Sequence, residues 1–371
     1  MLGAIIGDIC GSNYEFTPVQ TDDVELLGYG SFNFTDETVL TVAIADAYMN
    51  QSPYAKALSD YTQAHPLRRY GKWFTHWATS KELEPYNSYG NGSAMRVSAI
   101  GLLAQSEKEV LIEAKKSAEV THSHPEGIKG AQAVALAIYL AKIGTKKLEI
   151  KRRIEEAFGY NLSRGLAEIR KTYRYDITCQ GSVPEAMIAF LESTNFESAI
   201  KNAILLRGDA DTQASIAGAI AEAYYKQIPQ YLINAVHRLV SEDLMAVVEA
   251  FSVRYASLKK EEVIEEKVTT KGWLKVCTAQ ADDPIYQKQQ VVIMPSNAST
   301  MKSKKSEIDY EALLNETPEQ EMERLNNDPL WIKEEGRWMR PSEQMEESYL
   351  AREAWLEKRK ALQAQEQPES K

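Results

Sequence analysis

The sequence predicts an all-α fold: a compact multi-helix domain over residues 1–257, followed by a C-terminal extension that is partly helical. Two observations lead to this prediction. Up to about residue 257 the apolar residues recur mostly at the spacing of amphipathic helices, and the alternation typical of strands is nearly absent. The composition then changes, beginning with a charge run at residues 259–267. A chain of 371 residues is long enough for one large domain and an appendage.

Four segments carry the helical pattern most clearly. They are residues 34–49, 127–143, 185–191 and 211–225. Gly144 is a typical C-terminal stop for the second segment, and Pro229 follows the end of the fourth. Pro184 is expected to open the third helix, because proline is tolerated in a first turn. Long functional loops are expected at residues 10–34 and 80–96.

The C-terminal extension has a different character. Residues 272–294 contain Val-Val-Ile-Met, which is compatible with a short strand, and residues 295–305 are typical of a flexible linker. Residues 341–366 form a highly charged helix candidate that ends in a polar tail. This helix could pair with a second copy, cap the main domain or contact a protein partner, and the sequence favours none of the three.

Charge and cysteine content exclude several classes of protein. The net charge of −10 argues against a general nucleic-acid binder, although an anionic small molecule is compatible if metal ions or backbone dipoles supply positive charge. Cys10, Cys179 and Cys277 are too few and too scattered for a disulfide framework or a zinc site. The N-terminus has no basic region and reaches Asp8 at once, and no later run is apolar enough to span a membrane. We therefore expect a cytoplasmic protein.

Two acidic clusters each stand at the start of a strong helical pattern. Their sequences are Phe34-Thr35-Asp36-Glu37-Thr38 and Gly208-Asp209-Ala210-Asp211-Thr212. Each offers a hydroxyl and two carboxylates within one helical turn, and oxygen ligands suit hard cations such as Mg²⁺, Mn²⁺ or Ca²⁺. Threonine and aspartate are also ordinary N-cap and first-turn residues, so capping is the competing explanation. Residues 21–23 have the same residue types, but no amphipathic helix follows, and we expect a loop or turn there.

Two further segments could contact a ligand. Residues 86–96 are rich in glycine and asparagine, so their backbone N–H groups can form a nest for phosphate, to which Arg96 would add a charge-assisted contact; an ordinary turn is the alternative. In residues 121–127, we expect His122 to bind substrate or Ser123 to cap the following helix. A metal site at the His-x-His pair is disfavoured by the proline that follows it.

The two acidic clusters and the segments 86–96 and 121–127 together resemble the ADP-ribosylglycohydrolase family, the helical hydrolases related to dinitrogenase-reductase-activating glycohydrolase. The resemblance also takes in residues 3–16, 179–186 and 217–225. It covers roughly residues 1–250 and involves at least six ordered motifs, which makes it specific.

The resemblance implies a compact all-α fold with two Mg²⁺ ions at the base of an ADP-ribose cleft, with Mn²⁺ as a substitute. It implies as metal ligands Thr35, Asp36, Glu37, Asp209, Asp211 and Thr212. Glu15 matches a glutamate on a mobile loop near the metals. The implied substrate-binding residues are Asn91, Gly92, Ser93, Met95, Arg96, His122 and Ser182. The two cysteines at positions 10 and 179 are expected to be packing residues.

Two positions depart from the family pattern. The first cluster usually reads Thr-Asp-Asp, whereas this chain has Glu37 at the third position, which keeps the charge and adds a methylene. The second cluster usually opens with two glycines, whereas this chain has Arg207 before Gly208. Arg207 would touch the metal pocket or face solvent. Neither change deletes a charged ligand.

We therefore predict a Mg²⁺-dependent hydrolase that cleaves the glycosidic bond between ADP-ribose and a modified protein side chain, or a related ADP-ribosyl conjugate. Its partner would be ADP-ribose or an ADP-ribosylated protein, with no nucleic acid and no membrane. One carboxylate, Glu15 or Asp36, would assist the attacking water, with Glu37 beside it in the catalytic group. The alternatives are a catalytically weakened ADP-ribose-binding protein, serving immunity or regulation, and a phosphohydrolase that uses the same metals.

Overall fold

The computed structural model describes residues 1–19, 23–27, 32–271, 333–334 and 337–338. Its elements are, in chain order, α1 (Leu2–Gly11), α2 (Asp36–Asn50), α3 (Tyr54–Ala64), α4 (Lys72–Thr79), α5 (Gly92–Met95), α6 (Ser98–Leu103), α7 (Glu107–Glu119), α8 (Pro125–Lys142), α9 (Lys147–Phe158), α10 (Leu166–Thr172), α11 (Cys179–Leu191), α12 (Phe196–Ile204), α13 (Ala210–Tyr225), α14 (Gln230–Leu239), α15 (Glu242–Lys271), β1 (Lys333–Glu334) and β2 (Arg337–Trp338). β1 and β2 pair antiparallel. The predicted all-α class is confirmed.

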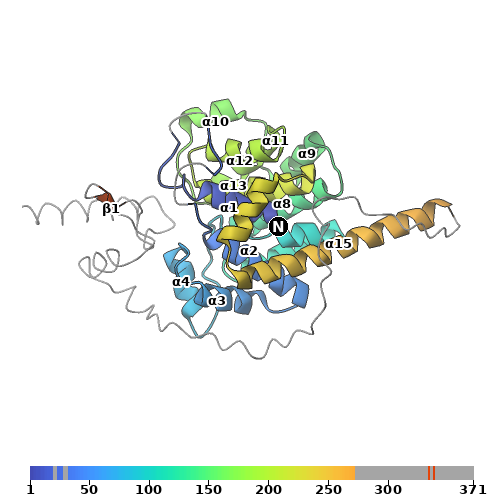
Figure 1. Ribbon diagram of the computed structural model, residues 1–371, viewed down its shortest axis with the longest axis horizontal. Coiled ribbons are helices and arrows are strands. Elements are labelled where there is room, and N and C mark those ends of the chain that lie inside the picture. Colours follow the sequence, from blue (N-terminus) through green and yellow to red (C-terminus); the bar gives the residue numbers. More distant parts are fainter. Residues whose placement is uncertain (20–22, 28–31, 272–332, 335–336, 339–371) are drawn as a thin grey trace, which may run out of the picture.

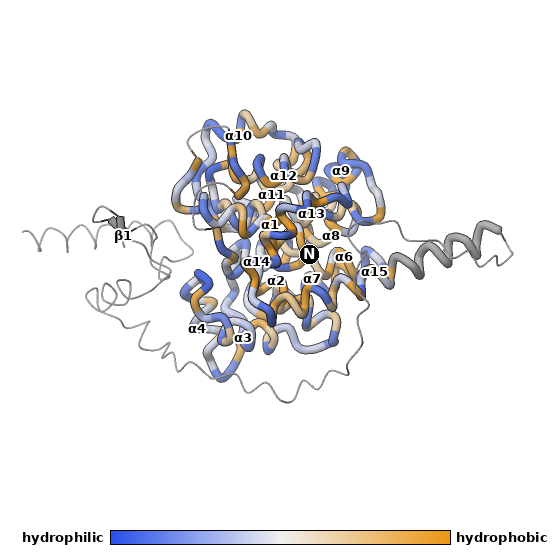
Figure 2. Tube along the Cα trace, in the orientation of Figure 1, coloured by the Kyte–Doolittle hydropathy of each residue, from blue (hydrophilic) through white to orange (hydrophobic). Residues whose placement is uncertain are grey.

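The helices pack around a central pair, α1 and α13, which lie side by side in the middle of the domain (Figure 1). Residues 3–11 of α1 are all buried. A β-carbon placed on Gly7 would lie 2.1 Å from the Ala214 carbonyl oxygen, so only glycine permits this backbone approach. Helices α8, α11 and α12 surround α13, and α2 packs on α1. Hydrophobic stretches gather on the central helices (Figure 2), as burial of apolar surface requires.

Three of the four predicted helices are confirmed, and the start of the remaining one is wrong. α2, α8 and α13 match the segments that begin near residues 34, 127 and 211. Pro184 does not open a helix, because α11 already begins at Cys179 and contains Pro184 in its interior. The Thr178 side chain caps this earlier start by accepting a hydrogen bond from the Gly181 N–H at 3.1 Å. Burial of the Pro184 turn within the core offsets the hydrogen bond that proline cannot donate.

Of the predicted loop at 10–34, the described residues 12–19, 23–27 and 32–34 lie between α1 and α2. Of the predicted loop at 80–96, residues 80–91 lie between α4 and the single turn of α5. The last described helix of the domain, α15, packs on α2 and α6 and then projects away from the other helices (Figure 1). α15 continues through residue 257, so the domain boundary expected there stays a prediction.

Several sequence-based expectations fall outside the described residues. They are the strand near 272–294, the linker at 295–305, the charged helix at 341–366 and most of the acidic segment 21–23. In the part of the chain that is described, no helix has the length and apolar content that crossing a membrane requires.

Candidate active site

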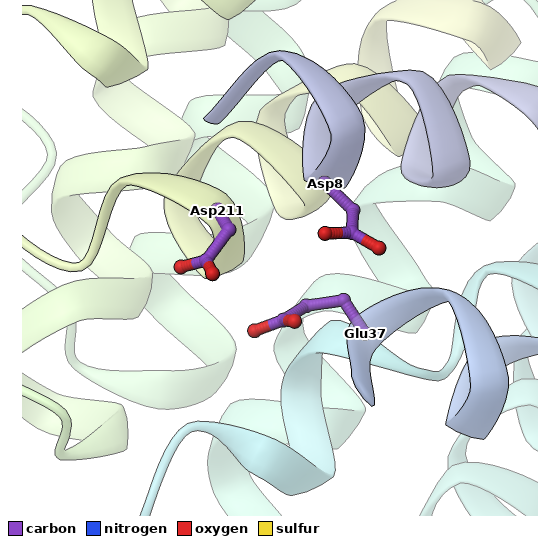
Figure 3. Close-up of side chains that lie close together, drawn as sticks. All are labelled: Asp8, Glu37 and Asp211. Atoms are coloured by element: carbon purple, nitrogen blue, oxygen red, sulfur yellow. The ribbon is translucent and has the colours of Figure 1, made fainter. Parts of the chain in front are cut away.

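Buried carboxylates from three helices and one loop converge near the centre of the domain. Oxygens of Asp8, Glu37 and Asp211 lie within 4.8 Å of one another, and we call this group the helix triad. Figure 3 shows its three side chains pointing toward one another from α1, α2 and α13. Oxygens of Glu15, Asp209 and Asp211 form a second group within the same distance, the loop triad. Asp211 belongs to both triads and so joins them into one acidic centre.

The fold assembles this centre by bringing helix ends together. α2 begins at Asp36 after the extended N-cap residue Thr35, and α13 begins directly after its N-cap residue Asp209. The acidic side chains of α2 and α13 therefore lie in first turns, where the helix macrodipole stabilises negative charge. The close approach of α1 to α13 brings Asp8 beside Asp211, and glycine permits this approach, because a β-carbon on Gly11 would lie 2.5 Å from the Asp211 Cα.

Asp8 is a member of the helix triad that the sequence analysis did not identify as a ligand. Its carboxylate accepts hydrogen bonds from the Thr35 N–H at 2.9 Å and hydroxyl at 2.6 Å, and from the Thr38 N–H at 3.1 Å and hydroxyl at 2.5 Å. Asp8 thereby fixes the start of α2. The sequence signal that could have found it is a single carboxylate within the otherwise apolar segment 2–11.

The threonine hydroxyls of the two clusters both lie at the helix triad. The Thr212 hydroxyl donates to Glu37 Oε1 at 2.7 Å. The Thr35 hydroxyl contacts both Asp8 Oδ1 and Glu37 Oε2. Because a hydroxyl has one proton and Thr35 donates it to Asp8, the contact with Glu37 needs a proton on the Glu37 carboxyl group or a nearby cation. The arrangement suits a hard cation held by carboxylate and hydroxyl oxygens.

The electrostatics of the centre indicate the same chemistry. Burial, together with repulsion by Asp8, raises the pKa of Glu37 to about 7. Burial and the neighbouring carboxylate of Glu15 likewise raise the pKa of Asp209 to about 7. Burial and like-charge repulsion also raise the pKa of Asp36, which belongs to neither triad, and of the shared Asp211. A divalent cation would relieve this repulsion without protonation, so the residues present fit a bound metal ion.

Arg69, in the connection between α3 and α4, is a second residue that the sequence analysis did not identify. Its Nη1 lies 2.6 Å from Glu15 Oε2 and 3.6 Å from Asp211 Oδ2, so it contacts two members of the loop triad. The Tyr175 hydroxyl donates to the other oxygen of Glu15 at 3.3 Å. Arg69 belongs to no motif, and its contact with Glu15 spans 54 positions, so no local pattern could have revealed it.

The glycine-rich loop meets the acidic centre through Asn91. The Asn91 side-chain amide donates to Asp209 Oδ2 at 2.7 Å and to Ser182 Oγ at 3.1 Å. The Thr212 hydroxyl lies 4.0 Å from the sulfur of Met95, at the other end of the same turn. The Asn91 side chain thus joins two predicted site residues, Asp209 and Ser182, while Met95 meets Thr212, so this turn forms one wall of the acidic centre.

Ser93 and Arg96 have their polar groups in the interior. The Ser93 hydroxyl donates to the Gly127 carbonyl oxygen at 2.7 Å, which ties the loop to α8. Arg96 is completely buried and donates from Nη2 to the Ser117 carbonyl oxygen at 3.0 Å and the Thr121 hydroxyl at 2.9 Å. These contacts direct both side chains into the packing beneath the loop.

His122 lies directly beneath the loop and is 1% exposed. Its Nδ1 lies 2.7 Å from the Thr121 hydroxyl, which already accepts a hydrogen bond from Arg96. Burial and the charge of Arg96 lower the pKa of His122 well below its usual range, so the ring is neutral. The arrangement that satisfies these groups has Thr121 donating to Nδ1 and the proton on Nε2. Nε2 has no hydrogen-bond partner among the described residues, and a β-carbon on Gly92 would lie 3.3 Å from it.

The remaining residues singled out in the sequence cap a helix, face solvent or pack in the interior. The cap of α8 is His124, whose Nδ1 accepts from the Glu126 N–H at 3.1 Å, and not Ser123 as the sequence analysis considered. Arg207, which departs from the family pattern, is exposed. Cys10 and Cys179 are buried free thiols, as expected for packing residues.

Comparison with known proteins identifies the family to which the chain is similar. A model of the ADP-ribosylglycohydrolase family matches residues 1–261. Over 263 aligned residues, covering 61% of this chain and 69% of the relative, the chain is 27% identical to the ADP-ribosylarginine hydrolase Tri1 of Pseudomonas putida (strain GB-1). Over 293 residues, covering 58% of this chain and 80% of the relative, it is 27% identical to the ADP-ribosylhydrolase ARH3 of Gallus gallus.

A solved structure supports the fold. An ADP-ribosylglycohydrolase-related protein complex aligns with a TM-score of 0.53 and 21% identity, covering 68% of this chain and 97% of that one. The predicted family resemblance is confirmed. Because the family model spans residues 1–261 of the 371, the chain belongs to the ADP-ribosylglycohydrolase family and is a glycohydrolase enzyme.

Proposed function

We propose that this enzyme uses Mg²⁺ to hydrolyse the glycosidic bond between ADP-ribose and a modified protein side chain, or a related ADP-ribosyl conjugate. The observation that carries the proposal is the pair of triads joined at Asp211 and adjoining the Asn91 loop. The names of the relatives Tri1 and ARH3, an ADP-ribosylarginine hydrolase and an ADP-ribosylhydrolase, support the substrate class. Residues 1–257 would form the catalytic unit.

Two metal ions would bind at the acidic centre, one at each triad. The helix triad would hold its ion together with Thr35 and Thr212, whose hydroxyls already contact Glu37. Asp36 would complete the ligands from α2. Mg²⁺ suits this oxygen-only set, and Mn²⁺ could replace it. When bound, the ions would orient the ribose hydroxyls and lower the pKa of the attacking water.

The protein's own residues would bind and orient the substrate. The turn that begins at Asn91 would receive the pyrophosphate on its backbone N–H groups, with the neutral His122 donating a hydrogen bond from Nε2. Ser182 would lie beside the same group, because Asn91 joins it to Asp209. Glu15 or Asp36 would take the proton from the attacking water, since burial and neighbouring charges raise the pKa of both carboxyls.

The test is release of free ADP-ribose from an arginine-ADP-ribosylated protein and from a serine-ADP-ribosylated peptide, each with Mg²⁺ and with EDTA. We expect release from at least one substrate, abolished by EDTA and by Asp211→Asn, because Asp211 serves both triads. Release of phosphate or AMP instead would favour a phosphohydrolase. No release from either substrate would contradict the proposal for those two linkages.

A second candidate function is a protein that binds ADP-ribose with little turnover. Two observations favour it: Glu37 replaces the usual aspartate, and Arg69 contributes a fixed charge to the loop triad. Calorimetry with ADP-ribose separates the two candidates, because saturable binding without release of product from either linkage would support the binding protein.

A further inference from the structure

We propose that Arg69 is an internal counter-ion that competes with a divalent cation for the loop triad, so that the two triads bind their cations with unequal affinity. This inference rests on the metal centre of the proposed function. Arg69 lies outside the predicted set of metal ligands. Its role is to position Glu15 and the loop that carries Glu15.

Among the described residues, the contacts of Arg69 lie mostly on the loop side of the centre, and only Asp211 also belongs to the helix triad. Its Nη1 contacts the carboxylates of Glu15 and Asp211, and both Nη1 and Nη2 donate to the Ser12 carbonyl oxygen at 3.2 Å and 3.3 Å. Its guanidinium carbon also lies 5.8 Å from the centre of the Phe16 ring. Glu15 and Asp211 are two of the three members of the loop triad. Three of the four contacted residues belong to the segment that follows α1, so a single side chain holds that segment against α13.

The backbone at Arg69 indicates that this position is built into the fold. Arg69 has a φ of 63°, in the left-handed region that an arginine rarely adopts. Its neighbours are fixed on both sides, since Arg68 lies 3.7 Å above the Phe34 ring and Tyr70 stacks on Phe74. With both neighbours anchored, the left-handed turn directs the guanidinium toward the acidic centre. The ion pairs with Glu15 and Asp211 offset the strain.

A divalent cation at the loop triad would meet this charge directly. An arginine cannot lose its proton near neutral pH, so it must move away from Glu15 or repel the incoming ion across a partly buried site. The helix triad meets less of this competition, because Arg69 contacts only its shared member Asp211, at 3.6 Å, whereas in the loop triad it also pairs with Glu15 at 2.6 Å. The helix triad therefore binds its cation more tightly. Filling the loop triad releases Glu15 and the segment at residues 12–16.

The experiment is a Mn²⁺ titration of the full-length chain in which the free ion is followed by electron paramagnetic resonance. We expect Arg69→Asn to tighten the weaker binding event about tenfold and to leave the tighter event within about twofold. Asparagine removes the charge and tolerates the left-handed backbone. Arg69→Gly also removes the charge but fits the left-handed backbone without strain, so the same result in both variants would show that the effect comes from the lost charge and not from a damaged fold. Arg69→Lys keeps a charge and should retain the weaker affinity.

Two controls assign the effect to the loop triad. Asp209→Asn should remove only the weaker event, because Asp209 belongs to the loop triad alone. Arg153→Asn removes the same charge from an ion pair of the same 2.6 Å length, with Glu107, and should change neither event. An unchanged or weakened second event in both Arg69→Asn and Arg69→Gly would overturn the inference while leaving the metal centre intact. Absence of Mn²⁺ binding in every variant and in the unaltered chain would overturn both.

Discussion

The Asp8 carboxylate accepts hydrogen bonds from both the N–H and the hydroxyl of Thr35, at 2.9 Å and 2.6 Å, and so joins α1 to the first turn of α2. The same carboxylate accepts two further hydrogen bonds from Thr38. Four donors on one buried carboxylate make Asp8 a support of the acidic centre as well as a member of it. The position of Glu37 therefore depends on a residue 29 positions earlier in the chain.

Asp8→Asn should lower the free energy of unfolding by about 2 kcal/mol. The amide NH₂ would replace one carboxylate oxygen and would face threonine groups that donate to that oxygen in the unaltered chain. It should also reduce the rise in melting temperature that Mg²⁺ produces. Urea unfolding with Mg²⁺ and with EDTA measures both effects. Asp60→Asn, which alters only an exposed pair with Lys56, should stay within about 0.5 kcal/mol of the unaltered chain. Equal effects of the two variants would contradict the role of Asp8.

Local patterns predicted the elements well and the acidic centre in part. The segments of α2, α8 and α13 could be predicted because their apolar residues repeat with the helical period. The ligand-rich first turns could be predicted because hydroxyl and carboxylate residues stand together in the chain. Arg69 could not, since it reaches the centre through tertiary packing alone, and the only local signal for Asp8 is its place as a lone carboxylate in an apolar segment. The helix start predicted at Pro184 was wrong, because burial of this turn in the core overrides the local preference of proline for the first turn.

In the presence of EDTA, the free energy of unfolding should fall as pH rises from about 4.5 to about 7, because of Glu37. Its pKa is raised to about 7 in the folded chain by burial and the charge of Asp8, so the folded state binds a proton that the unfolded state has released. The contribution is present below pH 4.5 and is lost by pH 7, with a size of about 3 kcal/mol. Denaturant unfolding at several pH values, measured for the unaltered chain and for Glu37→Gln, separates the contribution of Glu37 from that of the histidines.

With saturating Mg²⁺ the same slope should disappear or reverse, since the cation takes the place of the proton and binds more tightly as Glu37 ionises. In EDTA, a stability difference between the unaltered chain and Glu37→Gln that does not change with pH would contradict this account.

Glu37→Asp should weaken Mg²⁺ binding about tenfold, although aspartate is the usual residue of the family at this position. The two carboxylate oxygens of Glu37 contact Thr35 and Thr212 on opposite sides of the helix triad. A side chain shorter by one methylene cannot keep both contacts, so the Thr212 hydroxyl would lose its acceptor. Calorimetric titration with Mg²⁺ measures the change, and Glu25→Asp, in the loop after α1, is the control. Tighter binding by Glu37→Asp would show that the centre is built for aspartate.

His122→Phe should weaken ADP-ribose binding about tenfold and leave Mg²⁺ binding unchanged, because the Nε2 donor faces the Gly92 turn and not the triads. Phenylalanine keeps a planar ring in the buried site and removes the donor. Calorimetry with each ligand separates the two effects. His76→Phe, in α4, is the matched control and should leave both affinities unchanged. Loss of Mg²⁺ binding in His122→Phe would place the defect in the packing beneath the loop instead.

Gly7→Ala should lower the free energy of unfolding by about 3 kcal/mol or more, because the added methyl would overlap the Ala214 carbonyl oxygen at 2.1 Å. The opposing atom belongs to the backbone of a buried helix and cannot rotate away, so α1 and α13 must separate. Since Asp8 follows Gly7 directly, that separation should also weaken Mg²⁺ binding. Gly165→Ala is the matched control, with its nearest atom, Glu192 Oε1, at 3.7 Å, and should change stability by less than about 1 kcal/mol. Equal stability of the two variants in urea would mean that α1 can shift along α13 without penalty.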